Sequence, residues 1–127
     1  MRIVQLVAAA AATFLMSPLG IAQVGAELQC IETADDETLI SELDAEQLCA
    51  GSTSATGPVD CYREGDSETT LSNIQLIALC RCAVDSTPVA CFEAATASTD
   101  LFDDKVIRSC SAIETRKLRP DCTPRER

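Results

Sequence analysis

Cysteine is the residue type whose number and spacing could do chemistry in this chain. Three of the eight cysteines, Cys80, Cys82 and Cys91, lie within the stretch ALCRCAVDSTPVACFEAA at positions 78–95. Thiolates act as nucleophiles, metal ligands and redox groups. The CRC segment lacks the two-residue spacer of a CxxC redox motif, and the chain has no histidine to activate a thiolate or complete a common zinc site. We therefore expect no catalytic residue, no metal site and no cofactor.

Acidic residues are the second group that could do chemistry. Seven carboxylates between Glu32 and Glu46 could bind calcium or act as an acid–base pair. The chain has no calcium loop of the D-x-[DN]-x-[DN]-G type, and a two-carboxylate hydrolase needs a cleft that so small a domain struggles to build. The missing histidine also excludes Ser-His-Asp catalysis. A solvated acidic face is the better interpretation, and we expect the protein not to be an enzyme.

The first 26 residues have the pattern of an export signal. Met1 and Arg2 form a positive start, residues 3–16 are apolar, and the following small residues permit cleavage after Ala22 or, preferably, after Ala26. The sequence predicts a signal peptide (1–26), a disulfide-rich helical repeat domain (27–122) and a flexible C-terminal tail (123–127). It predicts a secreted, extracellular protein, with the periplasm or cell surface as alternatives, and no stable membrane insertion after cleavage.

The charge balance narrows the range of partners. After Ala26 the chain carries 9 basic and 20 acidic residues, a net charge of 9 − 20 = −11. Such a protein should be repelled by nucleic acid and by anionic membrane surfaces. Eight cysteines in a small exported chain favour a disulfide framework.

The cysteine spacing contains an internal repeat. Steps between seven of the cysteines are 19, 12, 19, 11, 19 and 12 residues, so the pattern recurs every 30 or 31 residues, and Cys82 alone is out of register. This period is typical of stacked supersecondary units. Three 20-residue blocks share apolar residues, namely Ile31, Tyr62 and Phe92 after the first cysteine, and Ile40, Leu71 and Leu101 at the eleventh position. The repeat register also assigns the aromatic residues Tyr62, Phe92 and Phe102 to the core.

Each block predicts a hairpin of two short helices. Ser72 and Gln75 have capping-box spacing at the start of a helix that continues at helical spacing to Cys80. Thr87 is a natural N-cap, and Gly65 is expected to end a helix. The alternating pattern of a β-strand is missing. The predicted fold class is all-α, with short disulfide-stapled helical hairpins in tandem as three repeats of about 30 residues.

Two disulfide registers fit the cysteine spacing. Pairing across the longer step gives Cys30–Cys49, Cys61–Cys80, Cys91–Cys110 and Cys82–Cys122. Pairing across the shorter step gives Cys49–Cys61, Cys80–Cys91, Cys110–Cys122 and Cys82–Cys30. Loop entropy contributes roughly 3 kcal/mol per bridge in either register and does not decide between them. The longer step is constant whereas the shorter one varies, which favours the longer pairing.

The whole architecture, with an export signal, a short mature chain and an even number of cysteines, resembles the small secreted cysteine-rich proteins that microbes release as effectors. The resemblance implies a non-enzymatic protein that acts by binding an extracellular partner.

Two polar loops held at both ends by cysteines, residues 50–60 and 83–90, are the candidate binding segments. Their candidate residues are Ser52, Thr53, Ser54, Thr56, Asp85, Ser86 and Thr87. We expect these loops to contact an extracellular protein partner. Two alternatives are a carrier that holds a small apolar ligand, such as a lipid or sterol, between the helices, and a protease inhibitor that uses a disulfide-held loop.

Overall fold

The computed structural model describes residues 19–126, and all helices of this part of the chain are short except the first. Their bounds are α1 (Leu19–Glu37), α2 (Glu42–Cys49), α3 (Gly57–Glu68), α4 (Asn73–Cys80), α5 (Thr87–Ser98), α6 (Asp103–Cys110) and α7 (Ala112–Thr115). The described residues form no named strand, only an isolated bridge between Leu118 and Pro124. The predicted all-α fold is confirmed.

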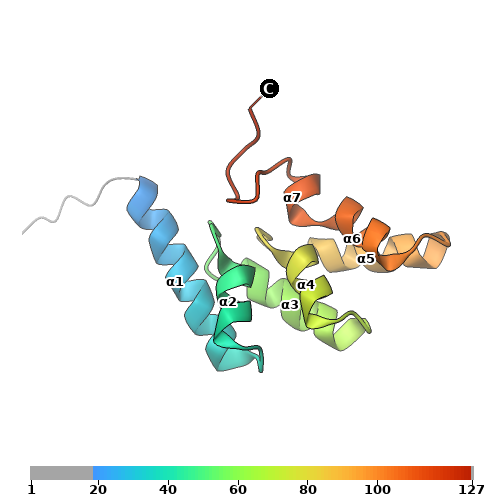
Figure 1. Ribbon diagram of the computed structural model, residues 1–127, viewed down its shortest axis with the longest axis horizontal. Helices are drawn as coiled ribbons and strands as arrows, with labels where there is room; N and C mark the ends of the chain where they lie inside the picture. The colour runs from blue at the N-terminus through green and yellow to red at the C-terminus, as the bar shows by residue number, and fades with distance from the viewer. Residues whose placement is uncertain (1–18, 127) are drawn as a thin grey trace, which may run out of the picture.

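The helices pair into three hairpins that lie side by side (Figure 1). The hairpins are α1 with α2, α3 with α4, and α5 with α6. The first helix of each hairpin packs on the first helix of the next, and the second helices pack in the same order. Two layers result, and each hairpin contacts its neighbours in the series. The descent of the hairpins from one repeated unit stays a prediction from the sequence.

Four disulfides hold the helices together. They join Cys30 to Cys49, Cys61 to Cys80, Cys91 to Cys110 and Cys82 to Cys122, and the described residues contain no free cysteine. Three of the bridges each close a 19-residue step and connect the two helices of one hairpin. The fourth spans 40 residues and ties the end of the second hairpin to the C-terminal segment. These are the pairs of the longer register.

Local sequence explains where the helices begin. The Ser72 side chain accepts a hydrogen bond from the Gln75 N–H, and the Gln75 side chain accepts one from the Ser72 N–H, so the predicted capping box is confirmed. Ser41 caps α2 in a similar way through the Asp44 N–H. The prediction that Gly65 ends a helix is wrong. Gly65 lies inside α3, where a Cβ atom would come within 2.5 Å of Leu76, so it permits close packing instead.

The core contains the residues that face the neighbouring hairpin. Tyr62 and Phe92 are buried as predicted, but the assignment of Phe102 to the core is wrong, because this side chain is 87% exposed. The eleventh position of each block follows the same rule, with Ile40 and Leu71 buried and Leu101 49% exposed. A following hairpin lies beside the first two turns, whereas none follows the third. The last turn therefore keeps its apolar residues in water.

A C-terminal segment, residues 116–125, fastens the hairpins together on the side away from their turns (Figure 1). Arg116 donates a hydrogen bond to the Cys82 carbonyl (2.8 Å), and Arg81 donates one to the Pro120 carbonyl (3.0 Å). In the first hairpin, Gly51 has a positive φ of 70° and packs so closely that its Cβ would lie 2.4 Å from the Asp121 carbonyl oxygen. The segment thus contacts all three hairpins through backbone groups and one disulfide.

The expected tail, residues 123–127, makes specific contacts as far as Arg125. Its N–H donates to the Lys117 carbonyl (3.0 Å), and its guanidinium bonds the Leu118 carbonyl and the Glu114 carboxylate. The predicted signal peptide, residues 1–26, lies outside the described residues up to position 18, and α1 runs through both expected cleavage positions. None of the described helices has the length and hydropathy that a membrane crossing requires.

Candidate interaction surface

The two loops predicted from the sequence meet at the end of the molecule that carries the C-terminal segment. They meet because the backbone of Gly57 packs directly against that of Ala83 and Val84. Of the candidate residues, Thr53, Thr56, Asp85 and Thr87 are exposed, Ser54 and Ser86 are half-buried, and Ser52 is buried. The exposed four are available to a partner, whereas Ser52 is not.

Hydrogen bonds within each loop account for several of these polar residues. The Ser52 hydroxyl donates to the Ser54 carbonyl (2.6 Å) and accepts from the Ser54 N–H. The Ser54 hydroxyl accepts from the Gly57 N–H (2.8 Å) at the start of α3. In the second loop, the side chain and N–H of Thr87 hold the pKa of Asp85 below its usual range. The loops are internally bonded turns rather than open polar segments.

Replacing Ser52 by alanine should lower the free energy of unfolding by about 1–2 kcal/mol, because the Ser54 backbone groups lose a buried partner. Thr53→Ala, at the exposed neighbouring position, should change it by less than about 0.5 kcal/mol. Urea denaturation followed by circular dichroism measures both. Equal stability of the two variants would show that Ser52 has no structural role.

Large apolar side chains gather at the hairpin turns, which sequence reasoning had placed in the core or passed over. Seven described large apolar residues are exposed, and five of them lie at or beside the turns: Leu39, Leu43, Ile74, Leu101 and Phe102. We name these five residues the turn edge. In Figure 1 the three turns follow one another along a single outer border of the molecule. The turn edge is therefore an apolar row on a disulfide-held frame.

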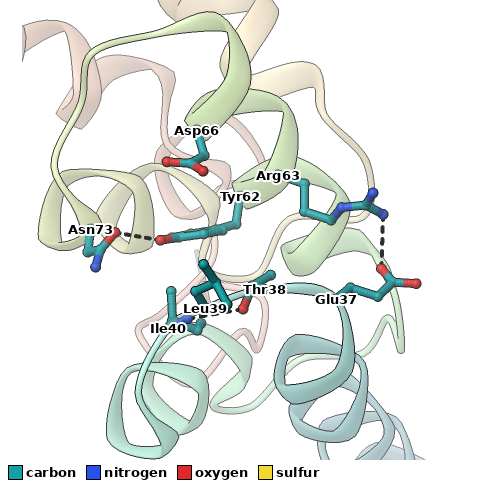
Figure 2. A pocket seen from close by; sticks show the side chains of 8 residues that line it. All are labelled: Glu37, Thr38, Leu39, Ile40, Tyr62, Arg63, Asp66 and Asn73. Carbon is teal, nitrogen blue, oxygen red and sulfur yellow. Dashed lines mark hydrogen bonds and ion pairs between the residues drawn. The ribbon is translucent and has the colours of Figure 1, made fainter.

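A pocket of about 410 Å³ opens between the first two hairpins at this edge. Figure 2 shows the Tyr62 ring at its centre, between Asp66 on one side and the turn with Leu39 and Ile40 on the other. The Tyr62 hydroxyl donates a hydrogen bond to the Asn73 side-chain oxygen, 2.5 Å away. The pocket therefore has an aromatic floor, an apolar lip and a carboxylate wall.

Charged groups tune the chemistry of this pocket. Arg63 forms an ion pair with Glu37 (3.1 Å), which closes one end of the pocket. Asp66 takes part in none of the three ion pairs found among the described residues. Burial raises the pKa of Tyr62, and the negative charges of Asp66 and Asp44 raise it further. The phenol is therefore neutral, in a negative electrostatic potential that favours a cation.

A second hollow of about 390 Å³ lies between the second and third hairpins. It is lined by Gln75 and by the turn residues Leu101 to Asp104, and the Gln75 side chain donates to the Asp104 carboxylate (3.4 Å). Ile74, 79% exposed, stands between Asn73, which lines the first pocket, and Gln75, which lines the second. The two hollows are thus neighbours along the turn edge.

The two ends of the molecule carry opposite charge. Carboxylates surround the turn edge in the last turns of α1 and α3 and the first turns of α2 and α6. They are Asp35, Asp36, Glu37, Asp66, Glu68, Glu42, Asp44, Asp103 and Asp104. Basic residues concentrate instead in the C-terminal segment, as Arg116, Lys117, Arg119 and Arg125. The apolar turn edge is the acidic end of a polarised molecule.

The cysteines and carboxylates hold no second kind of site in the described part of the chain. The eight cysteines are all bonded in disulfides, and among residues 19–126 no cluster of cysteine, aspartate and glutamate is arranged to hold a metal ion. Four disulfides in a small protein fit an oxidising, extracellular setting. No family model, curated protein or solved structure matches this chain, so its surface chemistry is the basis for a functional proposal.

Proposed function

We propose that this protein is a secreted, effector-like interaction module that acts by binding an extracellular protein and catalyses no reaction. The observation that carries the proposal is the turn edge. Soluble proteins scatter single apolar side chains over their surface, but a row of them beside hollows is typical of a binding surface. The chemistry of the surface supports contact with a protein through apolar anchors and a polar surround.

The rigid frame supports the same proposal. Leu39, Ile74 and Phe102 lie on turns whose flanking helices are bridged by a disulfide in each hairpin. A surface already held in place loses little conformational freedom on binding, so more of the contact energy remains as affinity. The exposed loop residues Thr53 and Thr87 offer a second, polar surface at the opposite end.

A pull-down with two variants tests the proposal and separates the two surfaces. The turn variant carries Leu39→Ser, Ile74→Ser and Phe102→Ser, and the loop variant carries Thr53→Ala, Thr56→Ala and Thr87→Ala. We expect wild type and the loop variant to retain the same protein from the extracellular medium, and the turn variant to bind it at least tenfold more weakly, because each buried apolar anchor contributes about 1.5 kcal/mol or more. Quantitative mass spectrometry of the bound fraction is the measurement.

Both variants change exposed residues, so their circular dichroism and thermal unfolding should match those of wild type. Loss of binding in the loop variant alone would move the binding surface to the loops. Retention of the same protein by both variants at full strength would contradict binding through either surface.

The alternative of an apolar-ligand carrier gains little support from the two pockets. Each is open to solvent and carries charged or polar side chains, among them Asp66, Arg63 and Asp104. A lipid or sterol requires a mostly apolar enclosure that buries most of its surface.

A further inference from the structure

We propose that the partner docks through a basic, amphipathic polypeptide segment, whose apolar side chains cover the turn edge and whose lysine or arginine enters the Tyr62 pocket. This inference rests on the proposed function and names the chemistry of the partner. It joins three features of one surface, namely the apolar row, the hollow that interrupts it and the charge around both.

Charge complementarity selects the partner. The turn edge is surrounded by nine carboxylates, while Arg63, the cation that lines the first pocket, is already paired with Glu37. An acidic partner would bring like charges together, and a neutral one would remove carboxylates from water without pairing them. A segment that alternates basic and apolar residues satisfies the carboxylates and the apolar side chains together.

The position of the carboxylates is itself unfavourable for folding. Asp35, Asp36 and Glu37 end α1, and Asp66 and Glu68 end α3, at helix termini whose partial charge is already negative. The last turns of these helices contain no basic residue. Helix stability therefore does not explain this charge, whereas attraction of a cationic partner does.

The Tyr62 pocket has the groups that a basic side chain needs. Tyr62 is only 4% exposed, so its ring forms a rigid floor, and the Asp66 carboxylate stands beside it. An ammonium or guanidinium group binds favourably to an aromatic ring with a carboxylate at hydrogen-bond distance. Leu39 and Ile40 at the lip can pack on the aliphatic stem of a lysine or arginine (Figure 2).

A second copy of this chain fits the surface less well. The arginines of the opposite end are engaged within the molecule, since Arg81, Arg116 and Arg125 each donate to a backbone carbonyl. Two copies, each with a net charge of −11 after Ala26, also repel one another. An anionic membrane is repelled for the same reason.

Two synthetic peptides of equal length and equal leucine pattern test the inference, one with lysine and arginine at its polar positions and one with glutamate. Fluorescence anisotropy of labelled peptide measures binding to the full protein. We expect the cationic peptide to bind and the anionic peptide not to bind, with the affinity falling as salt rises. Leu39→Ser should weaken the cationic peptide about tenfold.

A matched pair of charge variants on α3 separates a specific site from general attraction. Asp66 lies in the last turn, beside the pocket, and Asp60 lies in the first turn of the same helix. We expect Asp66→Asn to weaken the cationic peptide about threefold to fivefold, and Asp60→Asn to leave its affinity unchanged. Equal weakening by the two variants would overturn the inference, because it would mean that net charge alone attracts the peptide.

Other occupants appear as distinct outcomes. Binding to phosphatidylcholine vesicles in place of the cationic peptide would overturn the inference in favour of a membrane. A dimer in sedimentation velocity that Leu39→Ser abolishes would overturn it in favour of a second copy. If the pull-down recovers a partner through the turn edge while the cationic peptide fails to bind, the proposed function stands and this inference falls.

Discussion

Replacing Cys61 and Cys80 together by alanine should lower the free energy of unfolding by about 3 kcal/mol, the chain-entropy effect of a bridge that closes a 19-residue loop. A domain of this size is stabilised by only about 5–15 kcal/mol in total. The melting temperature should therefore fall by roughly 15 °C. Guanidinium denaturation and calorimetry of the non-reduced protein measure the two effects.

The bridge to the C-terminal segment gives a comparison within the same molecule. Cys82→Ala with Cys122→Ala opens a 40-residue loop and should cost about 4 kcal/mol on the same entropic basis. Gln47→Ala, an exposed helical position, serves as a control and should change stability by less than about 0.5 kcal/mol. If the Cys61 and Cys80 variant unfolded with the control, the account of disulfide-stapled hairpins would be wrong.

Gly57→Ala should destabilise the protein by about 3 kcal/mol, although alanine ordinarily stabilises a helix relative to glycine by up to about 1 kcal/mol. The added Cβ would lie 2.3 Å from the Ala83 carbonyl oxygen and 2.6 Å from the backbone of Val84. These are backbone atoms next to the bridged Cys82, so they cannot rotate away as a side chain could. Thermal and urea unfolding measure the loss.

Thr87 provides the matched control for Gly57. The segments Gly57-Pro58-Val59 and Thr87-Pro88-Val89 begin α3 and α5 in the same way, but Thr87 is exposed. Thr87→Ala should change stability by well under about 1 kcal/mol. A loss at Thr87 as large as that at Gly57 would show that helix starts are sensitive in general, and not that the two loops are packed against each other.

The sequence predicted the parts of the fold that depend on local chemistry. A capping box at Ser72 and Gln75 needs only two side chains and their own backbone, so its spacing was enough to place the start of α4. Short apolar helices between cysteines required partners and staples, which led to the all-α prediction. The expected stop at Gly65 failed because glycine also serves close packing, here beneath Leu76.

The candidate surface was harder to predict, because exposure is decided by packing between hairpins. Leu71 and Leu101 occupy the same position of their blocks, yet only Leu71 has a further hairpin beside it. Ser52 was chosen as a polar loop residue, and its hydroxyl is instead buried in hydrogen bonds to Ser54. A single sequence shows that a residue is polar or apolar, but the third dimension decides whether water or another element covers it.

The position of Tyr62 has a spectroscopic consequence. The chain contains one tyrosine and no tryptophan, so its intrinsic ultraviolet emission arises from a single ring. That ring lies in the pocket between the first two hairpins, hydrogen-bonded to Asn73 and beside Asp66. A ligand that enters the pocket must change the emission of this ring, whereas one that binds only at the third hairpin leaves it unaltered. The unlabelled protein therefore reports by its own light which part of its edge is occupied.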